Sequence, residues 1–185
     1  MDLKNNFYIL LVSLLFLSSC VSTYDLMDSH ATDVARFSTT ELNGNYSNSG
    51  DDKYHRLWNT LTNFKSSKRD TITISKNAVI NLHFENEKRL IMTAYENNKV
   101  LKTIVLKGNM KGDYFSIKRK LFLIPIPFFF IHQETKVILG QGQSGNVIVK
   151  YGKEKSAWIL IMAGGGLQGY YEDEYPKLDL EIGKN

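Results

Sequence analysis

RLIMTAYENNKVLKTIVLKG (residues 89–108) contains two strand-like runs that are separated only by Asn97 and Asn98. Asparagine tolerates the positive φ angles that a two-residue hairpin turn requires. The runs on either side are dominated by aliphatic and β-branched residues, which pleated strands favour. This stretch therefore predicts two antiparallel neighbouring strands joined by a tight turn.

Runs of the same kind continue on both sides of this hairpin, and short polar or glycine-containing breaks separate them. No helical crossover lies among them, so consecutive strands are expected to pair as antiparallel neighbours. With a first strand at 42–48, the sequence predicts a mainly β fold, an up-and-down meander of about eight or nine strands. Closure of a meander removes its exposed edges, so a closed barrel is expected. The other runs are TITI (71–74), AVINLHFE (78–85), DYFSIKRKLFLI (113–124), FFFIHQETKVIL (128–139), NVIVKY (146–151) and AWILIMA (157–163).

One amphipathic helix is expected after the first strand. Five apolar or aromatic residues recur there at helical spacing, and Asp51 or Asp52 stands where it would cap the first turn. The helix is expected to span about three turns and to lie across one end of the barrel as a lid or plug. Its inner face would consist of Tyr54, Leu57, Trp58, Leu61 and Phe64.

An uncharged run, LFLIPIPFFFI at 121–131, is interrupted only by Pro125 and Pro127. Proline lacks the N–H donor of a paired ladder, so the two prolines are expected to mark a corner between strands. Three uses of the run stay open: filling the core, forming an apolar rim for a hydrophobic ligand or for contact with lipid, and offering an edge to a protein partner. The basic triplet at 118–120 could meet phosphate headgroups or form a solvated strand end. The lid or apolar rim would comprise Tyr54, Trp58, Leu61, Phe128, Phe129 and Phe130.

Length and charge limit the classes of function. A chain of 185 residues favours one folded domain, and 43% hydrophobic residues can build a core. The net charge of +4 suits acidic surfaces such as anionic lipid headgroups. Nucleic acid is not expected as a partner, because no basic stripe is interleaved with aromatic residues. Cys20 is the only cysteine, so an intrachain disulfide is excluded.

No catalytic motif stands out. GQGQSG (140–145) has the glycine spacing of a dinucleotide-binding loop, but a strand-like run follows it where that motif requires a helix. A hairpin loop is therefore predicted, and no cofactor. Ser144 lacks the spacing of a nucleophile elbow. None of the four histidines has a histidine or cysteine at metal-ligand spacing. We expect neither a metal site nor an enzyme.

The N-terminal residues carry the clearest functional signal. The apolar stretch at 7–17 is too short for a spanning helix, which needs roughly 20 residues, and suits a signal peptide. Leu17, Ser18, Ser19 and Cys20 resemble the lipobox of bacterial lipoproteins. The resemblance implies that the Cys20 thiol receives a diacylglyceryl group, that the peptide is cut before it, and that the new amine is acylated. A plain secretory signal and an uncleaved anchor are the alternatives.

Together with the strand pattern, this resemblance predicts a lipoprotein signal peptide (1–19), a flexible tether (20–40), a β-barrel domain (41–168) and a C-terminal tail (169–185). Acyl chains on Cys20 would hold the protein on a membrane of the bacterial cell envelope. Valine follows the cysteine where an aspartate would signal inner-membrane retention, so the resemblance implies the outer membrane. The acidic YYEDEY of the tail is expected to be solvated.

Gly44, Asn45 and Tyr46 resemble a relaxed form of the G-x-W motif that opens lipocalin barrels. Tyrosine replaces the tryptophan, and AWILIMA holds no arginine to stack on it. The helix after the first strand is more similar to the lid of fatty-acid-binding barrels. This calycin-type architecture implies a lipocalin-like barrel that binds or carries a hydrophobic or amphipathic small molecule. The alternative is a non-enzymatic accessory protein that docks on an envelope complex, with a packed barrel and no ligand.

Overall fold

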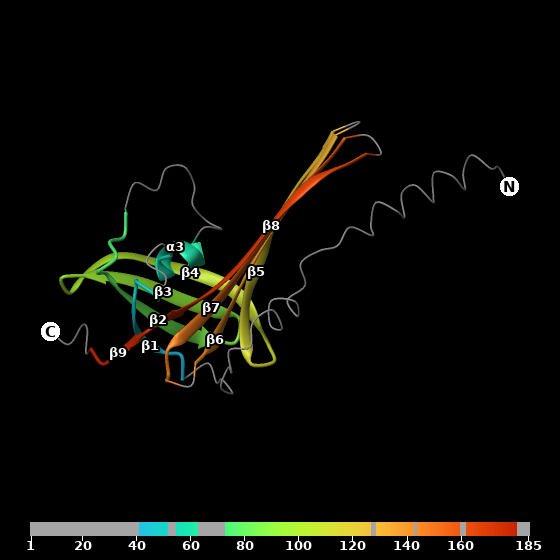
Figure 1. Ribbon diagram of the computed structural model, residues 1–185. Helices are drawn as coiled ribbons and strands as arrows, with labels where there is room; N and C mark the ends of the chain where they lie inside the picture. Colours follow the sequence, from blue (N-terminus) through green and yellow to red (C-terminus); the bar gives the residue numbers. More distant parts are fainter. Residues whose placement is uncertain are drawn as a thin grey trace, which may run out of the picture.

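The computed structural model describes residues 41–51, 55–62, 73–126, 129–142, 144–159 and 162–180, with the backbone alone at 118–126, 129–132, 154, 156–159 and 162–168. Nine antiparallel strands form one sheet in the order β8-β7-β6-β5-β4-β3-β2-β1-β9. Each strand from β1 to β7 pairs with the next along the chain, as Figure 1 shows, and β9 pairs with β1. The mainly β, up-and-down fold predicted from the sequence is confirmed.

The elements differ markedly in length. The strands β4 to β8 are much longer than β1 and β9, and the helix α3 lies between β1 and β2. The bounds are β1 Gly44–Ser47, α3 Leu57–Thr62, β2 Val79–Asn86, β3 Arg89–Glu96, β4 Lys99–Lys111, β5 Tyr114–Ile126, β6 Phe129–Gln141, β7 Val147–Ile159, β8 Met162–Tyr175 and β9 Lys177–Leu178.

The hairpin between β3 and β4 has the predicted geometry. Glu96 pairs with Lys99, so only Asn97 and Asn98 form the turn. Both asparagines have positive φ angles, 50° and 59°. Such angles match the twist of the flanking strands, and asparagine adopts them at low cost. The two-residue turn therefore sets the pairing nearest to it, and a register shift between Ala94 and Tyr95 changes the pairing beyond that point.

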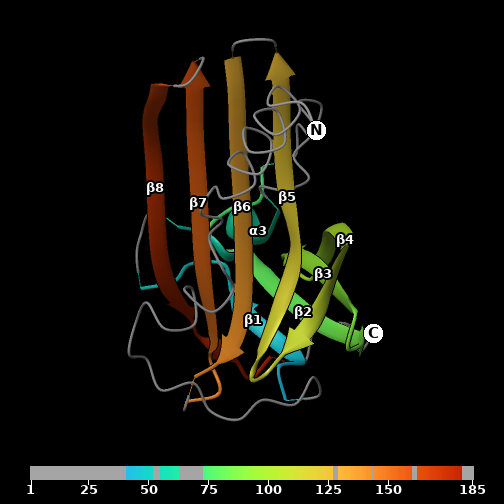
Figure 2. The same cartoon turned by 90° about the vertical axis from the view of Figure 1, so that its right-hand side faces the viewer.

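The sheet turns a corner within β4. Residues 99–107 of β4 pair with β3, whereas 108–111 pair with β5. At Gly108 a Cβ would lie 2.5 Å from both the Phe115 ring and the Ser116 carbonyl oxygen. A glycine without Cβ permits this close approach of the two backbones. The corner brings β1 to β4 across the lower parts of β5 to β8 (Figures 1 and 2).

The hydrophobic core lies between these two parts of the sheet. Phe84 of β2 meets Phe115 of β5 edge to face, with ring centroids 5.0 Å apart. Alternate residues of each strand point into the core, as period-two pleating dictates. The largest fully buried apolar or aromatic side chains are Tyr46, Tyr175, Phe115, Leu42, Leu57, Leu61, Ile74, Ile80, Leu82 and Leu90.

The edges of the sheet approach each other at one end. The chain leaves β8, passes Pro176 and forms β9, which pairs with β1. The backbone N–H of Ser47 donates to the carbonyl oxygen of Pro176 (2.9 Å), and that of Asp51 donates to Glu174 (3.3 Å). No ladder joins β8 to β1 within the described ranges. The expected closed barrel is therefore not shown.

Several expected strand limits differ from the structure. Thr73 and Ile74 lie outside any strand. The segment 152–156, expected as a break, continues β7, because β6 on one side and β8 on the other supply ladder partners along it. The three glycines at 164–166 lie within β8, so the tail expected from 169 begins inside that strand.

Pro125 also lies within a strand. It pairs with Phe130 in the β5–β6 ladder, one pair before the last, while Pro127 lies outside the described residues. The described pairing of β4 with β5 stops at Ile117, so β5 is an edge strand beyond that point. Proline is tolerated there because no ladder partner needs its missing N–H. The corner between β5 and β6 thus follows Ile126.

The helix is capped by a residue that the sequence did not indicate. Asn48, fully buried after β1, accepts a hydrogen bond from the backbone N–H of Trp58 at its Oδ1 (2.8 Å). Its Nδ2 donates to the carbonyl oxygen of Ser75 (2.7 Å), and its own carbonyl accepts from the Leu57 N–H (3.1 Å). Asn48, rather than the expected Asp51, therefore satisfies the start of α3, and Asp52 lies outside the described residues.

Replacing Asn48 by alanine is expected to lower the free energy of unfolding by at least about 2 kcal/mol, because a buried N–H and a buried carbonyl lose their partners. Urea denaturation followed by circular dichroism measures this change. Asn109→Ala, at an exposed position of β4, is the matched control and should stay within about 0.5 kcal/mol of wild type. Equal stabilities of the two variants would contradict the capping role.

Candidate functional site

The residues expected in a lid or rim are distributed over two places. Trp58 and Leu61 lie on α3, which covers the core, and their side chains are 5% and 0% exposed. Phe129 and Phe130 begin β6 at the far end of the long strands. Tyr54 and Phe128 lie outside the described residues, as do Leu17, Ser18, Ser19 and Cys20 of the expected lipobox. The structure does not bring the two groups together.

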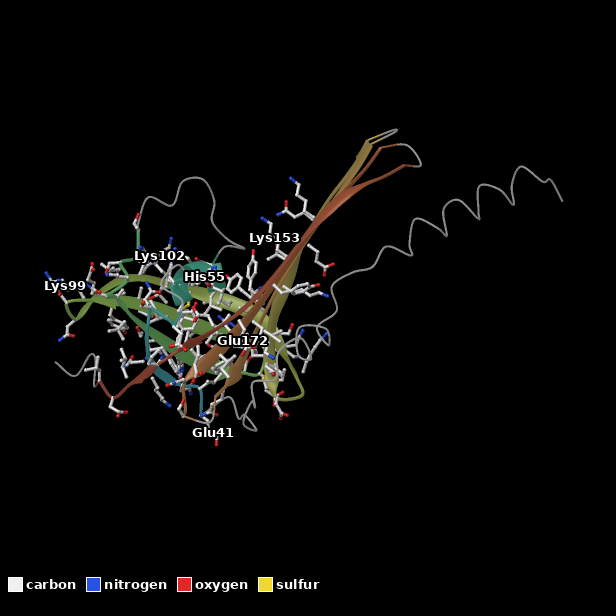
Figure 3. All side chains as sticks on the ribbon, in the orientation of Figure 1. Glu41, His55, Lys99, Lys102, Lys153 and Glu172 are labelled. Carbon is white, nitrogen blue, oxygen red and sulfur yellow. The ribbon has the colours of Figure 1, made fainter. Side chains whose placement is uncertain are left out.

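An aromatic stack joins the helix region to the long strands. The imidazole of His55 lies on the ring of Tyr171, with centroids 4.0 Å apart and planes 9° from parallel. Tyr171 stacks in turn on Tyr151 at 4.8 Å. Its hydroxyl donates to Oγ1 of Thr60 on α3 (3.2 Å). Figure 3 shows His55 at the helix, where the long strands pass beside it. The stack therefore holds α3 against β7 and β8.

A second tyrosine lies deeper under the same helix. Tyr175 is fully buried, beside Thr60 and Asp173. Burial raises the pKa of its phenol well above the usual value, the nearby Thr60 hydroxyl lowers it in part, and the charge of Asp173 raises it again. A Cβ on Gly50 would collide with the Asp173 carboxylate. The loop after β1 therefore lies directly against this cluster.

Two ion pairs lie on the opposite face of the long strands. Nζ of Lys150 is 3.3 Å from Oε2 of Glu172, its cross-strand partner, and Lys150 also lies over the ring of Tyr114. Nζ of Lys136 is 3.2 Å from Oε1 of Glu134. These side chains are largely buried. Burial of a charge costs free energy unless it is paired, so each lysine stabilises the carboxylate beside it.

The contacts of these groups join α3, the loops and the long strands to one another. Within the described ranges, no three histidine, cysteine or acidic residues are placed to hold a metal ion. The glycine-rich loop at 140–145 joins β6 to β7, as predicted for a hairpin, and its Ser144 hydroxyl donates to Glu174 (3.1 Å). Thr60 is 2% exposed, so the hydroxyl that accepts from Tyr171 is closed to solvent. The cluster packs the helix onto the sheet.

Four strands of the sheet project beyond the rest of the labelled elements (Figures 1 and 2). β5, β6, β7 and β8 extend beyond the other labelled strands and beyond the helix (Figures 1 and 2). We call this part, residues 120–126, 129–135, 153–159 and 162–169, the arm. Its backbone pairs from β5 to β8, with register shifts beside its base at 117–120 and near its outer end at 156–158.

The sequence interpretation missed Tyr171, Asp173 and Tyr175. They were read as part of a solvated acidic tail because three carboxylates stand among them. Their spacing of two residues is, however, the period of a strand with one buried face. That alternation was the available signal. The partners on α3 could not be found from it, because Thr60 is more than a hundred residues away.

Tyr175→Phe is expected to make protein stability less sensitive to alkaline pH. A tyrosine with a raised pKa in the folded state contributes stability that is complete below about pH 10, the unfolded value, and is lost as the pH rises further. Above that pH the free energy of unfolding should fall in both proteins. The fall should be less steep in the variant than in the wild type, by up to about 1.4 kcal/mol per pH unit. Urea titrations from pH 9 to 11, spanning that value of about 10, measure the slope. Tyr95→Phe on β3 is the control, and a slope unchanged by Tyr175→Phe would contradict this account.

Comparison of the chain with protein-family models, with curated proteins and with solved structures finds no match. In the part of the chain that the structure describes, no helix is long and apolar enough to cross a membrane.

Proposed function

We propose that this chain is a lipid-anchored lipoprotein of the bacterial cell envelope, held on the outer membrane by acyl chains on Cys20. In this proposal it has no catalytic activity and works as an accessory protein through its outer surface. The observation that carries the surface function is the filled interior: side chains from both parts of the sheet and from α3 form one continuous buried cluster.

The packing supports a docking function more than a carrier function. A small β-domain either fills its interior with side chains or leaves room for one ligand. Here Trp58 and Leu61 enter the core from above, and Tyr46 and Tyr175 occupy it from the sheet. The helix therefore acts as a plug, and its aromatic face is used in packing. A hydrophobic ligand would have to displace these side chains.

The anchor is supported by the position of the only cysteine in the chain. Cys20 directly follows a short apolar stretch and two small residues. One acyl chain gives marginal membrane binding, and two or more give durable attachment. The diacylglyceryl and N-acyl groups implied by the lipobox resemblance would meet that need.

Wild-type protein is expected to incorporate radioactive palmitate in a bacterial host, and Cys20→Ala is expected to lose the label and to accumulate as the longer precursor. Gel electrophoresis with autoradiography measures both. Ser19→Ala, which keeps a small residue before the cysteine, is the control and should be labelled. Equal labelling of Cys20→Ala would contradict acylation at this residue.

Native mass spectrometry should distinguish the docking function from the carrier function. Protein produced as Cys20→Ser, mixed with an excess of a long-chain fatty acid, is expected to keep its apo mass because the interior is filled. Trp58→Ala would open space in the core. This variant serves as the comparison, because a fatty acid bound in that space would raise its mass. Stoichiometric uptake by the protein with Trp58 intact would favour the carrier.

A further inference from the structure

The outer end of the arm brings together apolar residues from two distant parts of the sequence. The outermost row across the four strands consists of Ile126, Phe129, Ile159 and Met162, as the backbone pairing shows. The next row is Pro125, Phe130, Trp158 and Ala163. The first two residues of each row come from the proline-containing run at 121–131, and the last two come from 157–163. These two segments are far apart in the sequence and become neighbours only in the folded sheet.

No aspartate, glutamate, lysine or arginine occurs in the four outermost rows. The third row holds Ile124, Ile131 and Ala157, and the fourth Leu123, His132, Ser156 and Gly166. In both views these rows lie beyond the other labelled strands and the helix (Figures 1 and 2). A projecting end made of uncharged residues is unusual for a surface in water, where such patches indicate interaction sites.

We propose that the end of the arm inserts into the interfacial part of an anionic lipid bilayer. The rows described above would enter the acyl region, and the charged rows that follow would stay at the headgroups. The inference rests on the proposed function only because that function assigns the protein to a membrane. It adds a direct contact between the arm and the lipid. It does not require acylation of Cys20.

The dimensions fit shallow insertion. Four residues of β-strand at about 3.4 Å each extend about 14 Å. The hydrocarbon core of a bilayer is about 30 Å thick, so this length corresponds to less than one leaflet. Hydrogen bonds between the four strands satisfy most backbone N–H and C=O groups. The unpaired groups on the outer edges of β5 and β8 would still cost free energy in the acyl region. Pro125 lowers that cost on β5 because it has no N–H group.

The charges behind the apolar rows favour anionic headgroups. Basic residues follow behind the apolar rows: Lys155 stands in the fifth row, and Lys153 stands in the seventh, opposite Thr135 and in line with Lys120. Glu154 lies between the two lysines on β7. The side chains of Lys153 and Lys155 are exposed, and Figure 3 shows Lys153 on the arm. Glu134, at the same level, is buried beside Lys136. A band of cations next to an apolar end matches the order of headgroup and acyl chain in a membrane.

The chain carries its own probe for this contact. Its two tryptophans occupy the two environments to be compared: Trp158 lies in the second row of the arm, and Trp58 lies in the core. Trp58→Phe leaves Trp158 as the only tryptophan, and Trp158→Phe leaves Trp58. Both variants are made in the full chain with Cys20→Ser, so each has the same N-terminal segment and neither can be acylated at position 20.

Tryptophan fluorescence emission of each variant is measured with phosphatidylglycerol vesicles that carry either ordinary or brominated acyl chains. For Trp158 we expect a shift to shorter wavelength and quenching by the brominated chains; for Trp58 we expect neither. Failure of Trp158 to shift and quench, although the protein floats with the vesicles, would overturn the proposal. So would a shift of Trp158 that appears without vesicles as the protein concentration rises, because it would indicate contact between two copies of the chain.

The contribution of the basic band is tested by charge removal. A lysine near an anionic surface increases binding by about fivefold, so Lys153→Gln with Lys155→Gln should weaken vesicle binding roughly 30-fold. The matched control, Lys99→Gln with Lys102→Gln, makes the same charge change away from the arm (Figure 3). Equal losses in the two pairs, or equal binding to phosphatidylcholine vesicles, would overturn the assignment to anionic lipid. The outcome is independent of palmitate labelling, so the anchor and the arm can fail separately.

Discussion

The close passage of β4 over β5 at Gly108 is the constraint on which the architecture depends. A strand normally keeps one neighbour on each side along its length, but β4 leaves β3 and joins β5 at this residue. The exchange is possible only where no Cβ stands between the strands. Because the sheet folds over there, the short strands cover only the lower parts of β5 to β8. The upper parts are left as the arm.

Prediction from the sequence succeeded where the determining interaction is local. The turn at Asn97 and Asn98 lies between its own two strands, and β3 has the limits that were expected. The β-hairpin character of the loop at 140–145 followed from the run after it. Strand number and direction depend on many such local signals, so the meander was predicted correctly.

Prediction failed where the partners are far apart in the chain. Asn48 caps a helix that begins several residues later, and the nearer Asp51 was the more obvious choice by position. The segment 152–156 looks like a break on its own, but strands on both sides pair with it. Of the expected rim, Phe129 and Phe130 lie at the end of the arm, because the corner at Gly108 separates that end from the helix. Isolated glycines inside strand-like runs were the only hint of such a corner.

The pairing of β9 with β1 has a consequence for how the protein is made. The last described strand completes the edge that the first described strand leaves open, across more than 130 residues of chain. Contacts between such distant segments slow folding, because a long loop must close, at a cost in entropy, before the contacts can stabilise the structure. During synthesis β1 therefore waits on the ribosome with an unpaired edge until the C-terminal residues emerge. A nascent chain in that state is a natural substrate for chaperones that shield exposed strands.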